Sequence, residues 1–270
     1  KKVEVKNVVA VNSATSALHI ACLALGLGKN DWLWTSSITF VASANCGLYC
    51  KANIDFVDIN PLTGLISIEA LKIKLKKAET QGKLPKVLIP VHLAGASCDM
   101  KSIGELAKQY KFSVIEDASH AIGGKYNNKP VGSCEYSDIC VFSLHPVKII
   151  TTGEGGLATT NKKNLAQKMY DLRSHGITKN WHEFNSKNEG PWHYEQINLG
   201  FNYRMTDFQA ALGYRQIINY QKNLKLRRLL AKRYIKNFSK TDKITHMPYS
   251  SNSSFFVFQI FCKNRDKILK

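Results

Sequence analysis

Short apolar segments alternate with longer helical segments through most of the chain, and this alternation limits the possible folds more than any other feature. The apolar segments have the length and composition of buried strands and cover residues 8–11, 32–35, 54–58, 87–92, 112–116, 137–144 and 157–160. Helical patterns of about 10–15 residues lie between most of them, as is typical of βαβ units. We therefore expect an α/β fold with a mainly parallel sheet between layers of helices.

Polar residues follow three of these strands, at the sheet edge where open parallel sheets bind ligands. Residues 13–16 begin a helix, where free backbone N–H groups and small hydroxyls suit a phosphate, although a plain N-cap is the commoner role. Asp117 ends another strand. A buried carboxylate there needs a cation or hydrogen-bond donors, and a ligand, a helix cap or a structural ion pair would each satisfy it.

The third polar group contains a lysine in an unusual setting. The stretch VFSLHPVKIITTGEGG, residues 141–156, places Lys148 among Val147, Ile149 and Ile150, with no acidic residue beside it. Apolar surroundings lower the pKa of a lysine, and a neutral amine can attack a carbonyl to form a Schiff base. An ordinary surface lysine is the alternative. Glu154 and His145 in the same stretch have no role that we can distinguish from a structural one.

One cofactor needs all three polar groups. Pyridoxal phosphate (PLP) requires a lysine for the Schiff base, a carboxylate for the pyridinium nitrogen and a phosphate cup. Lys148 would also move a proton during transamination. Phe40 could stack on one face of the ring, or could simply pack in the core. The sequence contains no P-loop, GxGxxG, HExxH or GxSxG motif, so other phosphate-binding and hydrolytic chemistries lack support.

The composition weighs against several other classes of protein. The net charge of +18 suits a nucleic-acid surface or an anionic small molecule, but no nucleic-acid motif accompanies it, so we expect no nucleic-acid partner. The seven cysteines are scattered, which favours free thiols in a reducing cytosol over a zinc site, and we expect no bound metal. No apolar run reaches the ~18 residues of a membrane span, and no signal peptide is visible.

Taken together, the motifs resemble those of the DegT/DnrJ/EryC1/StrS family of sugar aminotransferases. The matching stretches run in family order from residue 12 to residue 213 and read NSATSALHIACLALGLG, TFVASANC, VIEDASHAIGG, VFSLHPVKIITTGEGG, RSHGI and GFNYRMTDFQAALG. The resemblance implies the type I fold of PLP-dependent aminotransferases. Residues 1–238 would form the PLP-binding large domain, without the family's N-terminal segment. Residues 239–270 would begin a truncated small C-terminal domain, in which we expect residues 254–262 to form a strand.

The resemblance also implies roles for residues around the cofactor ring. Lys148 would form the Schiff base with PLP, and Asp117 would pair with the pyridine nitrogen. His120 would lie beside the ring or its 3-hydroxyl, and Phe40 would stack on the ring. Some relatives are dehydratases with a histidine where the lysine stands, so Lys148 argues against that branch.

Further roles concern the phosphate and a second subunit. Thr15, Ser16 and Ser143 would hold the phosphate. Asn202 would reach the phosphate of the cofactor in the neighbouring subunit, and Arg204 is a candidate ligand for a carboxylate of the substrate or donor. The resemblance thus implies a homodimer with sites at the interface, which would account for the long, polar 175–200 segment.

Within the family, the stretches NSATSAL, PVHLAG, SCDM and GPWHYEQINLGFNYRMTD are most similar to transaminases of pseudaminic acid biosynthesis. Such an enzyme moves an amino group from L-glutamate to C4 of UDP-2-acetamido-2,6-dideoxy-β-L-arabino-hex-4-ulose. This similarity implies a cytoplasmic enzyme with a UDP-sugar substrate. The alternatives are a C4 transaminase for another nucleotide sugar, of the perosamine or bacillosamine type, and a non-catalytic regulator with the same fold.

Overall fold

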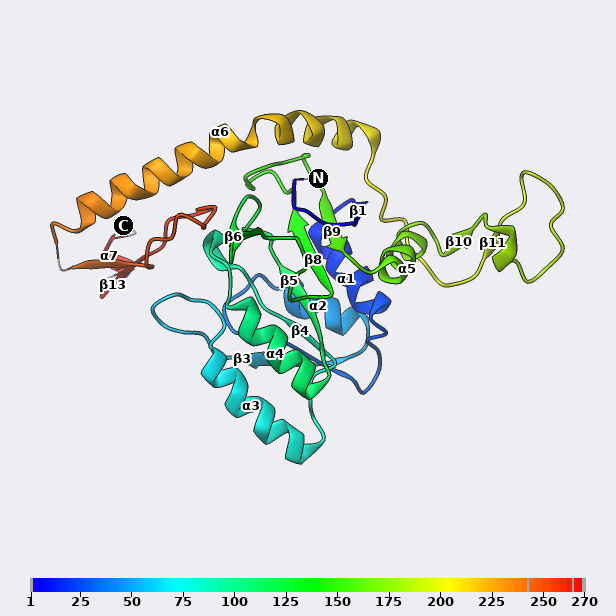
Figure 1. Ribbon diagram of the computed structural model, residues 1–270, viewed down its shortest axis with the longest axis horizontal. Helices are drawn as coiled ribbons and strands as arrows, with labels where there is room; N and C mark the ends of the chain where they lie inside the picture. The colour runs from blue at the N-terminus through cyan, green and yellow to red at the C-terminus, as the bar shows by residue number, and fades with distance from the viewer. Residues whose placement is uncertain (1, 242, 264, 269–270) are drawn as a thin grey trace.

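A seven-stranded sheet in the order β1-β9-β8-β5-β4-β2-β3 forms the centre of the molecule (Figure 1). The computed structural model describes residues 2–241, 243–263 and 265–268. The strands are β1 (Asn7–Val11), β2 (Trp32–Ser36), β3 (Asn53–Val57), β4 (Val87–Ile89), β5 (Ser113–Asp117), β8 (Ile139–Ser143) and β9 (Gly156–Thr160). Of these seven strands, β9 alone runs in the opposite direction to the other six, so the mainly parallel sheet is confirmed.

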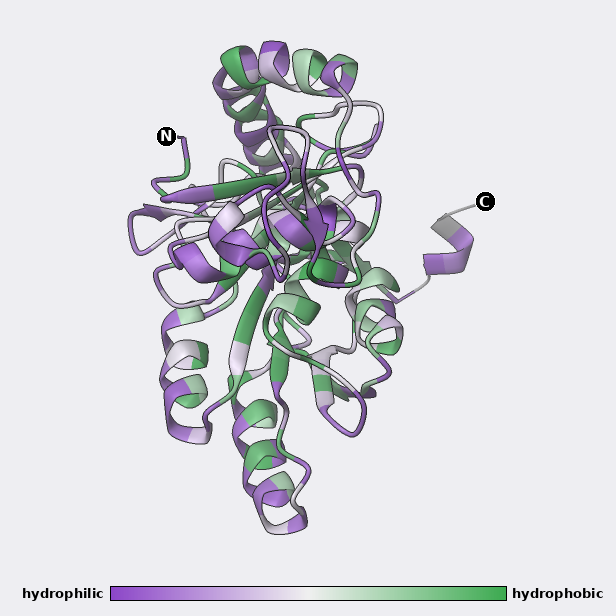
Figure 2. Ribbon diagram, turned by 90° about the vertical axis from the view of Figure 1, so that its right-hand side faces the viewer, coloured by the Kyte–Doolittle hydropathy of each residue, from purple (hydrophilic) through white to green (hydrophobic). Residues whose placement is uncertain are grey.

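Helices cover both faces of the sheet. The helices on one face are α1 (Ala14–Ala24), α2 (Ala42–Tyr49) and α5 (Lys163–Arg173), and those on the other are α3 (Ile68–Gln81) and α4 (Met100–Tyr110). Neighbouring strand residues such as Leu33 and Trp34 enter different clusters because side chains alternate between the faces of a strand. Figure 2 shows apolar central strands between helices that carry both hydrophobic and hydrophilic residues.

Helix starts follow capping residues in the sequence. The Asp99 side chain caps α4 by accepting a hydrogen bond from the Ser102 N–H. Thr206 and Gln209 form a capping box at the start of α6 (Asp207–Phe238), which satisfies N–H groups that have no partner within the helix. This helix is unbroken over 32 residues and lies along one side of the molecule (Figure 1). Among the described residues, no helix has both the length and the apolar character to cross a membrane.

The chain after α6 differs from the expected strand at residues 254–262. The strand β13 covers Ile260–Cys262 and pairs with β12 (Ile244–His246). The expectation was wrong for residues 254–259, because the backbone there bonds elsewhere: Ser254 N–H donates to the Gly95 carbonyl, and Phe256 N–H donates to the Ala94 carbonyl. The division of the chain into domains after residue 238 stays a prediction.

Residues 175–200 form an arm that extends away from the sheet (Figure 1). The short strands β10 (Ile177–Thr178) and β11 (Glu195–Gln196) pair at its base, and a 3₁₀ turn, η2, covers Trp181–Glu183. The remaining elements are η1 (Leu93–Gly95), β6 (Lys125–Tyr126), β7 (Lys129–Pro130) and α7 (Arg265–Ile268). Six of the cysteines are buried and Cys262 is half-buried, all with free thiols, as expected.

A buried hydrogen-bonded pair joins the ends of β4 and β5. His92 is fully buried, and its Nε2 lies 2.7 Å from Glu116 Oε2. The Ser137 hydroxyl donates to the other carboxylate oxygen of Glu116. The Cys98 N–H donates to His92 Nδ1 at 3.1 Å, so the imidazole is held from both sides. The pair fixes the backbone beside Asp117, whose carbonyl accepts a hydrogen bond from the His92 N–H.

We expect His92→Ala to lower the free energy of unfolding by about 3–5 kcal/mol, because the buried Glu116 carboxylate would lose its imidazole partner and keep only the Ser137 hydroxyl. Lys72→Ala is the matched control, since it breaks an exposed pair with Glu69 that contributes roughly 0–1 kcal/mol. Urea unfolding followed by circular dichroism measures both. Equal losses in the two variants would contradict the importance of the buried pair.

Candidate active site

The carboxyl ends of β1, β5 and β8 lie at one edge of the sheet, and the residues that follow them line a cavity of about 410 Å³. This volume falls within the ~300–1,000 Å³ usual for small-molecule sites. The cavity brings together most of the residues expected to bind a cofactor, namely Thr15, Phe40, Asp117, His120, Ser143 and Lys148. The structure thus brings these six residues together, and their roles toward a cofactor stay predictions.

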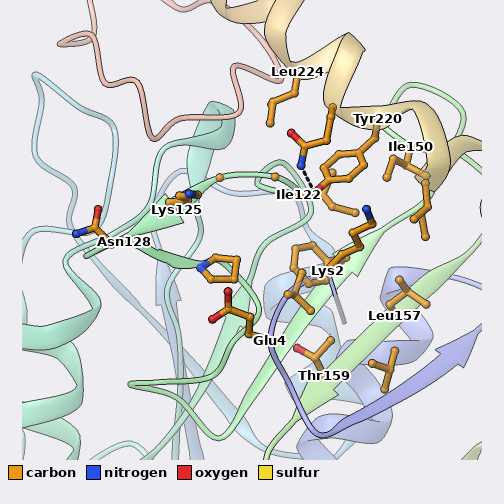
Figure 3. Close-up of a pocket in the computed structure, with 18 of the residues that line it drawn as sticks. Lys2, Glu4, Ile122, Lys125, Asn128, Ile150, Leu157, Thr159, Tyr220 and Leu224 are labelled. Atoms are coloured by element: carbon orange, nitrogen blue, oxygen red, sulfur yellow. Dashed lines mark hydrogen bonds between the residues drawn. The ribbon is translucent and has the colours of Figure 1, made fainter.

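A second cavity, of about 530 Å³, lies between α6 and the strands β8 and β9. Figure 3 shows its lining, with Ile122, Leu157, Tyr220 and Leu224 among the apolar side chains and Lys2 close to Tyr220. It contains none of the residues expected to bind cofactor or substrate. The cavity of about 410 Å³ is therefore the candidate active site, although it is smaller than the cavity beside α6.

Asp117 is the most deeply buried charged group of the candidate site, with 4% of its surface exposed. Its Oδ2 accepts a hydrogen bond from the Ser43 hydroxyl at 2.7 Å, and its Oδ1 accepts one from the Ser119 N–H at 3.0 Å. The Thr39 hydroxyl lies 2.8 Å from the Ser43 hydroxyl and extends this network. The two donors hold the carboxylate in place, and a carboxylate in this position suits a protonated ring nitrogen.

Sequence reasoning missed Ser43. It lies near the start of α2, and 74 residues separate it from Asp117. The stretch TFVAS carries no local signal of this contact, because it is the order β5-β4-β2 in the sheet that brings α2 above the end of β5. A hydroxyl four residues after Thr39 indicates a helix start and nothing more.

Lys148 is half-buried in the turn after β8, where its N–H donates to the His145 carbonyl at 2.9 Å. Burial lowers the pKa of its amine, and the nearby Asp117 carboxylate opposes that effect. The net lowering increases the fraction of neutral amine at a given pH, which is the form that attacks a carbonyl.

His120 faces the cavity from the turn after β5. Burial and the neighbouring Lys148 lower its pKa to about 4, against the opposing effect of Asp117, so its ring is neutral near pH 7. Its Nδ1 is buried and has no hydrogen-bond partner in the described parts of the chain. Its ring stacks on Phe256, with centroids 4.3 Å apart. A buried nitrogen without a partner is a candidate contact for a ligand.

The start of α1 also borders the cavity. Ser13 and Thr15 line it, together with Ser143 from the end of β8. Gly156 lies so close to the Ser13 carbonyl that a Cβ there would collide with it, so the backbones of β9 and α1 meet directly. Ser16 is buried instead, and its hydroxyl donates to Asn12 Oδ1 at 2.7 Å. Its role in holding a phosphate stays a prediction.

The remaining expected site residues lie at or beyond the rim of the cavity. Phe40 lines it with 72% of its surface exposed. Asn202 and Arg204 are exposed and do not line it, and their roles stay predictions. His145 and Glu154 both line the cavity near Lys148, with Nε2 and Oε1 3.7 Å apart.

The chemistry of the cavity fits PLP. It supplies a half-buried amine, a carboxylate held by two donors, a histidine nitrogen without a partner and a helix start with small hydroxyls. These are the groups that the aldehyde, the ring nitrogen and the phosphate of PLP require.

Sequence comparisons agree with this arrangement. Residues 1–270 match the profile of the DegT/DnrJ/EryC1/StrS aminotransferase family. The chain is 41% identical over 236 residues to the UDP-4-amino-4,6-dideoxy-N-acetyl-β-L-altrosamine transaminase of Campylobacter jejuni, covering 87% of this chain and 58% of that protein. It is 35% identical over 277 residues to the GDP-perosamine synthase of Caulobacter vibrioides, covering 98% of this chain and 69% of that protein.

Solved structures with the same fold include PseC of Helicobacter pylori, described as an aminotransferase of pseudaminic acid biosynthesis. Its TM-score is 0.84 at 30% identity, covering 97% of this chain and 67% of that one. The Bacillus subtilis protein NtdA, solved with its bound cofactor PMP, has a TM-score of 0.82 at 30% identity, covering 98% of this chain and 57% of that one.

The sequence and structural comparisons thus lead to one family. The chain spans 58% of the length of the altrosamine transaminase. The chain belongs to the DegT/DnrJ/EryC1/StrS aminotransferase family, whose enzymes use pyridoxal phosphate.

Proposed function

We propose that this chain forms the cofactor-binding part of a PLP-dependent transaminase that acts on nucleotide-linked keto sugars. The observation that carries the proposal is the meeting of Lys148, Asp117 and the start of α1 in one cavity. No single one of these features is specific, since each also has a common structural role. Their convergence, in a chain that belongs to a family of sugar aminotransferases, favours catalysis over a regulator that kept the fold.

The proposed chemistry divides between the cofactor and the protein. When bound, PLP supplies an aldehyde that condenses with amines and a ring that accepts electrons. Asp117, held in place by the Ser43 and Ser119 donors, would pair with the ring nitrogen in its protonated form. Lys148 would hold and return the proton that moves during transamination. His120 would contact the ring through its free nitrogen.

Further contacts would orient the cofactor. The backbone N–H groups at the start of α1, with the Thr15 and Ser143 hydroxyls, would hold the phosphate, and Ser16 would support this turn. Phe40 would cover one face of the ring. Its large exposed surface would then be shielded by the cofactor or by a second subunit.

We propose a homodimer as the working form. The arm of residues 175–200 extends away from the sheet (Figure 1) and carries the exposed aromatic residues Trp181, Trp192 and Tyr194. Large exposed aromatic side chains are typical of protein–protein contacts. Asn202, exposed at the base of this arm, would be free to reach the cofactor phosphate of the partner, and Arg204 to reach a carboxylate of the donor or substrate.

The proposed substrate is UDP-2-acetamido-2,6-dideoxy-β-L-arabino-hex-4-ulose, aminated at C4 with L-glutamate as donor in the cytoplasm, within pseudaminic acid biosynthesis. The support is the 41% identity to the altrosamine transaminase and the fold of PseC. The second candidate is a perosamine-type C4 transaminase, favoured by the 35% identity to the GDP-perosamine synthase over a larger share of this chain.

Reduction of the protein–PLP complex with borohydride, followed by proteolysis and mass spectrometry, should place the pyridoxyl group on Lys148. Lys148→Ala should lower kcat by at least about 10²–10⁴-fold, the usual contribution of a proton-transfer residue. Lys163→Ala, which removes an exposed amine at the start of α5, is the control and should change neither result. A label on any other lysine would overturn the assignment.

Ser43→Ala should weaken PLP binding to the apoprotein roughly tenfold, because Asp117 would lose one of its two hydrogen-bond donors. Titration with PLP, followed by absorbance, gives the Kd. Ser97→Ala is the matched control, since its half-buried hydroxyl donates to the Cys98 carbonyl, away from the candidate site. Unchanged affinity in Ser43→Ala would show that the hydroxyl does not hold the carboxylate in place.

The sugar can be identified by direct assay. With L-glutamate as donor, the protein should convert the UDP-linked 4-keto sugar with a kcat/KM at least about tenfold above that for the GDP-linked 4-keto sugar, since enzymes separate substrates by transition-state contacts worth about 1–3 kcal/mol each. NMR of the product should show a new amine at C4. Preference for the GDP sugar would favour the perosamine-type reaction instead.

A further inference from the structure

Residues 253–256 form hydrogen bonds with the loops that border the candidate active site. Ser254 is fully buried, and its hydroxyl donates to the His120 carbonyl at 2.8 Å. Its N–H donates to the Gly95 carbonyl at 3.0 Å, and the Phe256 N–H donates to the Ala94 carbonyl at 2.9 Å. The segment is therefore positioned by backbone hydrogen bonds and by a buried hydroxyl. None of these contacts involves the Phe256 side chain.

Two arginines of α6 hold the same segment from its other side. Arg227 donates from Nη1 to the Phe256 carbonyl at 2.9 Å. Arg228 donates from Nε to the Ser253 carbonyl at 3.0 Å, and from Nη2 to the Gly123 carbonyl at 3.3 Å. In Figure 1 the chain after α6 turns back toward the sheet. These bonds fix the segment between α6 and the turn that carries His120.

This anchoring places the Phe256 ring inside the cavity that contains Lys148. The ring stacks on His120 with an interplanar angle of 18°, and its centroid lies 4.5 Å from Lys148 Nζ. It thus contacts two of the residues proposed to bind the cofactor. Phe256 is not among the residues that sequence reasoning singled out.

An aromatic ring in this place acts on the Lys148 amine in two opposite ways. It excludes water, which disfavours the ammonium form, while its π face attracts the ammonium. The other charged or titratable groups that line the cavity are Asp117, His120, His145 and Glu154. Burial lowers the pKa of Lys148, and this effect exceeds the opposing effect of the Asp117 carboxylate.

We propose that Phe256 is a positioning residue of this active site, which holds the His120 ring and the Lys148 amine in place and keeps water away from them. The proposal rests on the proposed cofactor site. The 253–256 segment would then have a defined role. It supplies an aromatic side chain to a cavity whose other lining residues lie at the edge of the sheet.

The test compares Phe256→Leu with Phe256→Ala in the cofactor-free protein. Leucine keeps an apolar wall but lacks the π face, so the pKa of Lys148 should fall by about half a pH unit. Alanine admits water, so the pKa of Lys148 should rise toward the ordinary lysine value. The pKa of His120 should also rise from about 4, because burial is what lowers it most. The two substitutions should therefore shift the pKa of Lys148 in opposite directions.

Reductive ¹³C-methylation of the lysines followed by NMR titration measures the pKa of Lys148. The Lys148 signal is the one that disappears in Lys148→Arg. Proton NMR titration of the imidazole measures the pKa of His120. Phe258→Ala is the matched control, because Phe258 packs on Tyr234 and Phe238, outside the candidate site. Unchanged titrations in both Phe256 variants, or equal shifts in Phe258→Ala, would overturn the proposal. Since no cofactor is present, this result is independent of the borohydride labelling, and either can fail alone.

Discussion

The buried carboxylate of Asp117 is the constraint on which the candidate site depends. A charge with 4% of its surface exposed is tolerated inside a protein when donors or a cation compensate it. Here the donors come from α2 and from the turn after β5, so the carboxylate ties together two elements that pack on different parts of the sheet. One residue earlier, on the opposite face of β5, Glu116 pairs with His92 and holds the end of β4 beside it. The end of β5 is therefore fixed from both faces of the sheet.

The single antiparallel strand explains the position of Lys148. Because β9 reverses direction, the chain leaves the sheet at Ser143 and re-enters it at Gly156, its register partner at the same edge. The intervening loop has to fold over that edge, and it carries Lys148 into the cavity. Gly156 also contacts the backbone at Ser13, so the register of one strand pair sets the amine and the proposed phosphate cup relative to each other.

The sequence predicted those features of the structure that depend on short stretches of neighbouring residues. Strand and helix periods and polar residues after the strands are properties of short stretches, and the structure agrees with them. Contacts between distant stretches could not be predicted. Ser43 reaches Asp117 through the strand order, and 134 residues separate Ser254 from His120. The strand expected at residues 254–262 was partly wrong for the same reason: apolar residues there dock on a loop, and alternation alone does not distinguish docking from strand pairing.

The cofactor chemistry and the choice of sugar depend on different parts of the molecule. Lys148, Asp117 and the start of α1 are positioned by the sheet, and in the proposed mechanism they act on the cofactor whichever sugar is aminated. Relatives named for a UDP sugar and for a GDP sugar both match the chain, at 41% and 35% identity, which agrees with a shared cofactor site. In the proposed enzyme, groups at the rim would recognise the nucleotide and the sugar, and His145, Glu154 and Phe40 are exposed there. Substitutions at the rim can change the substrate without disturbing the buried carboxylate, because no hydrogen bond to Asp117 comes from a rim residue within the described chain.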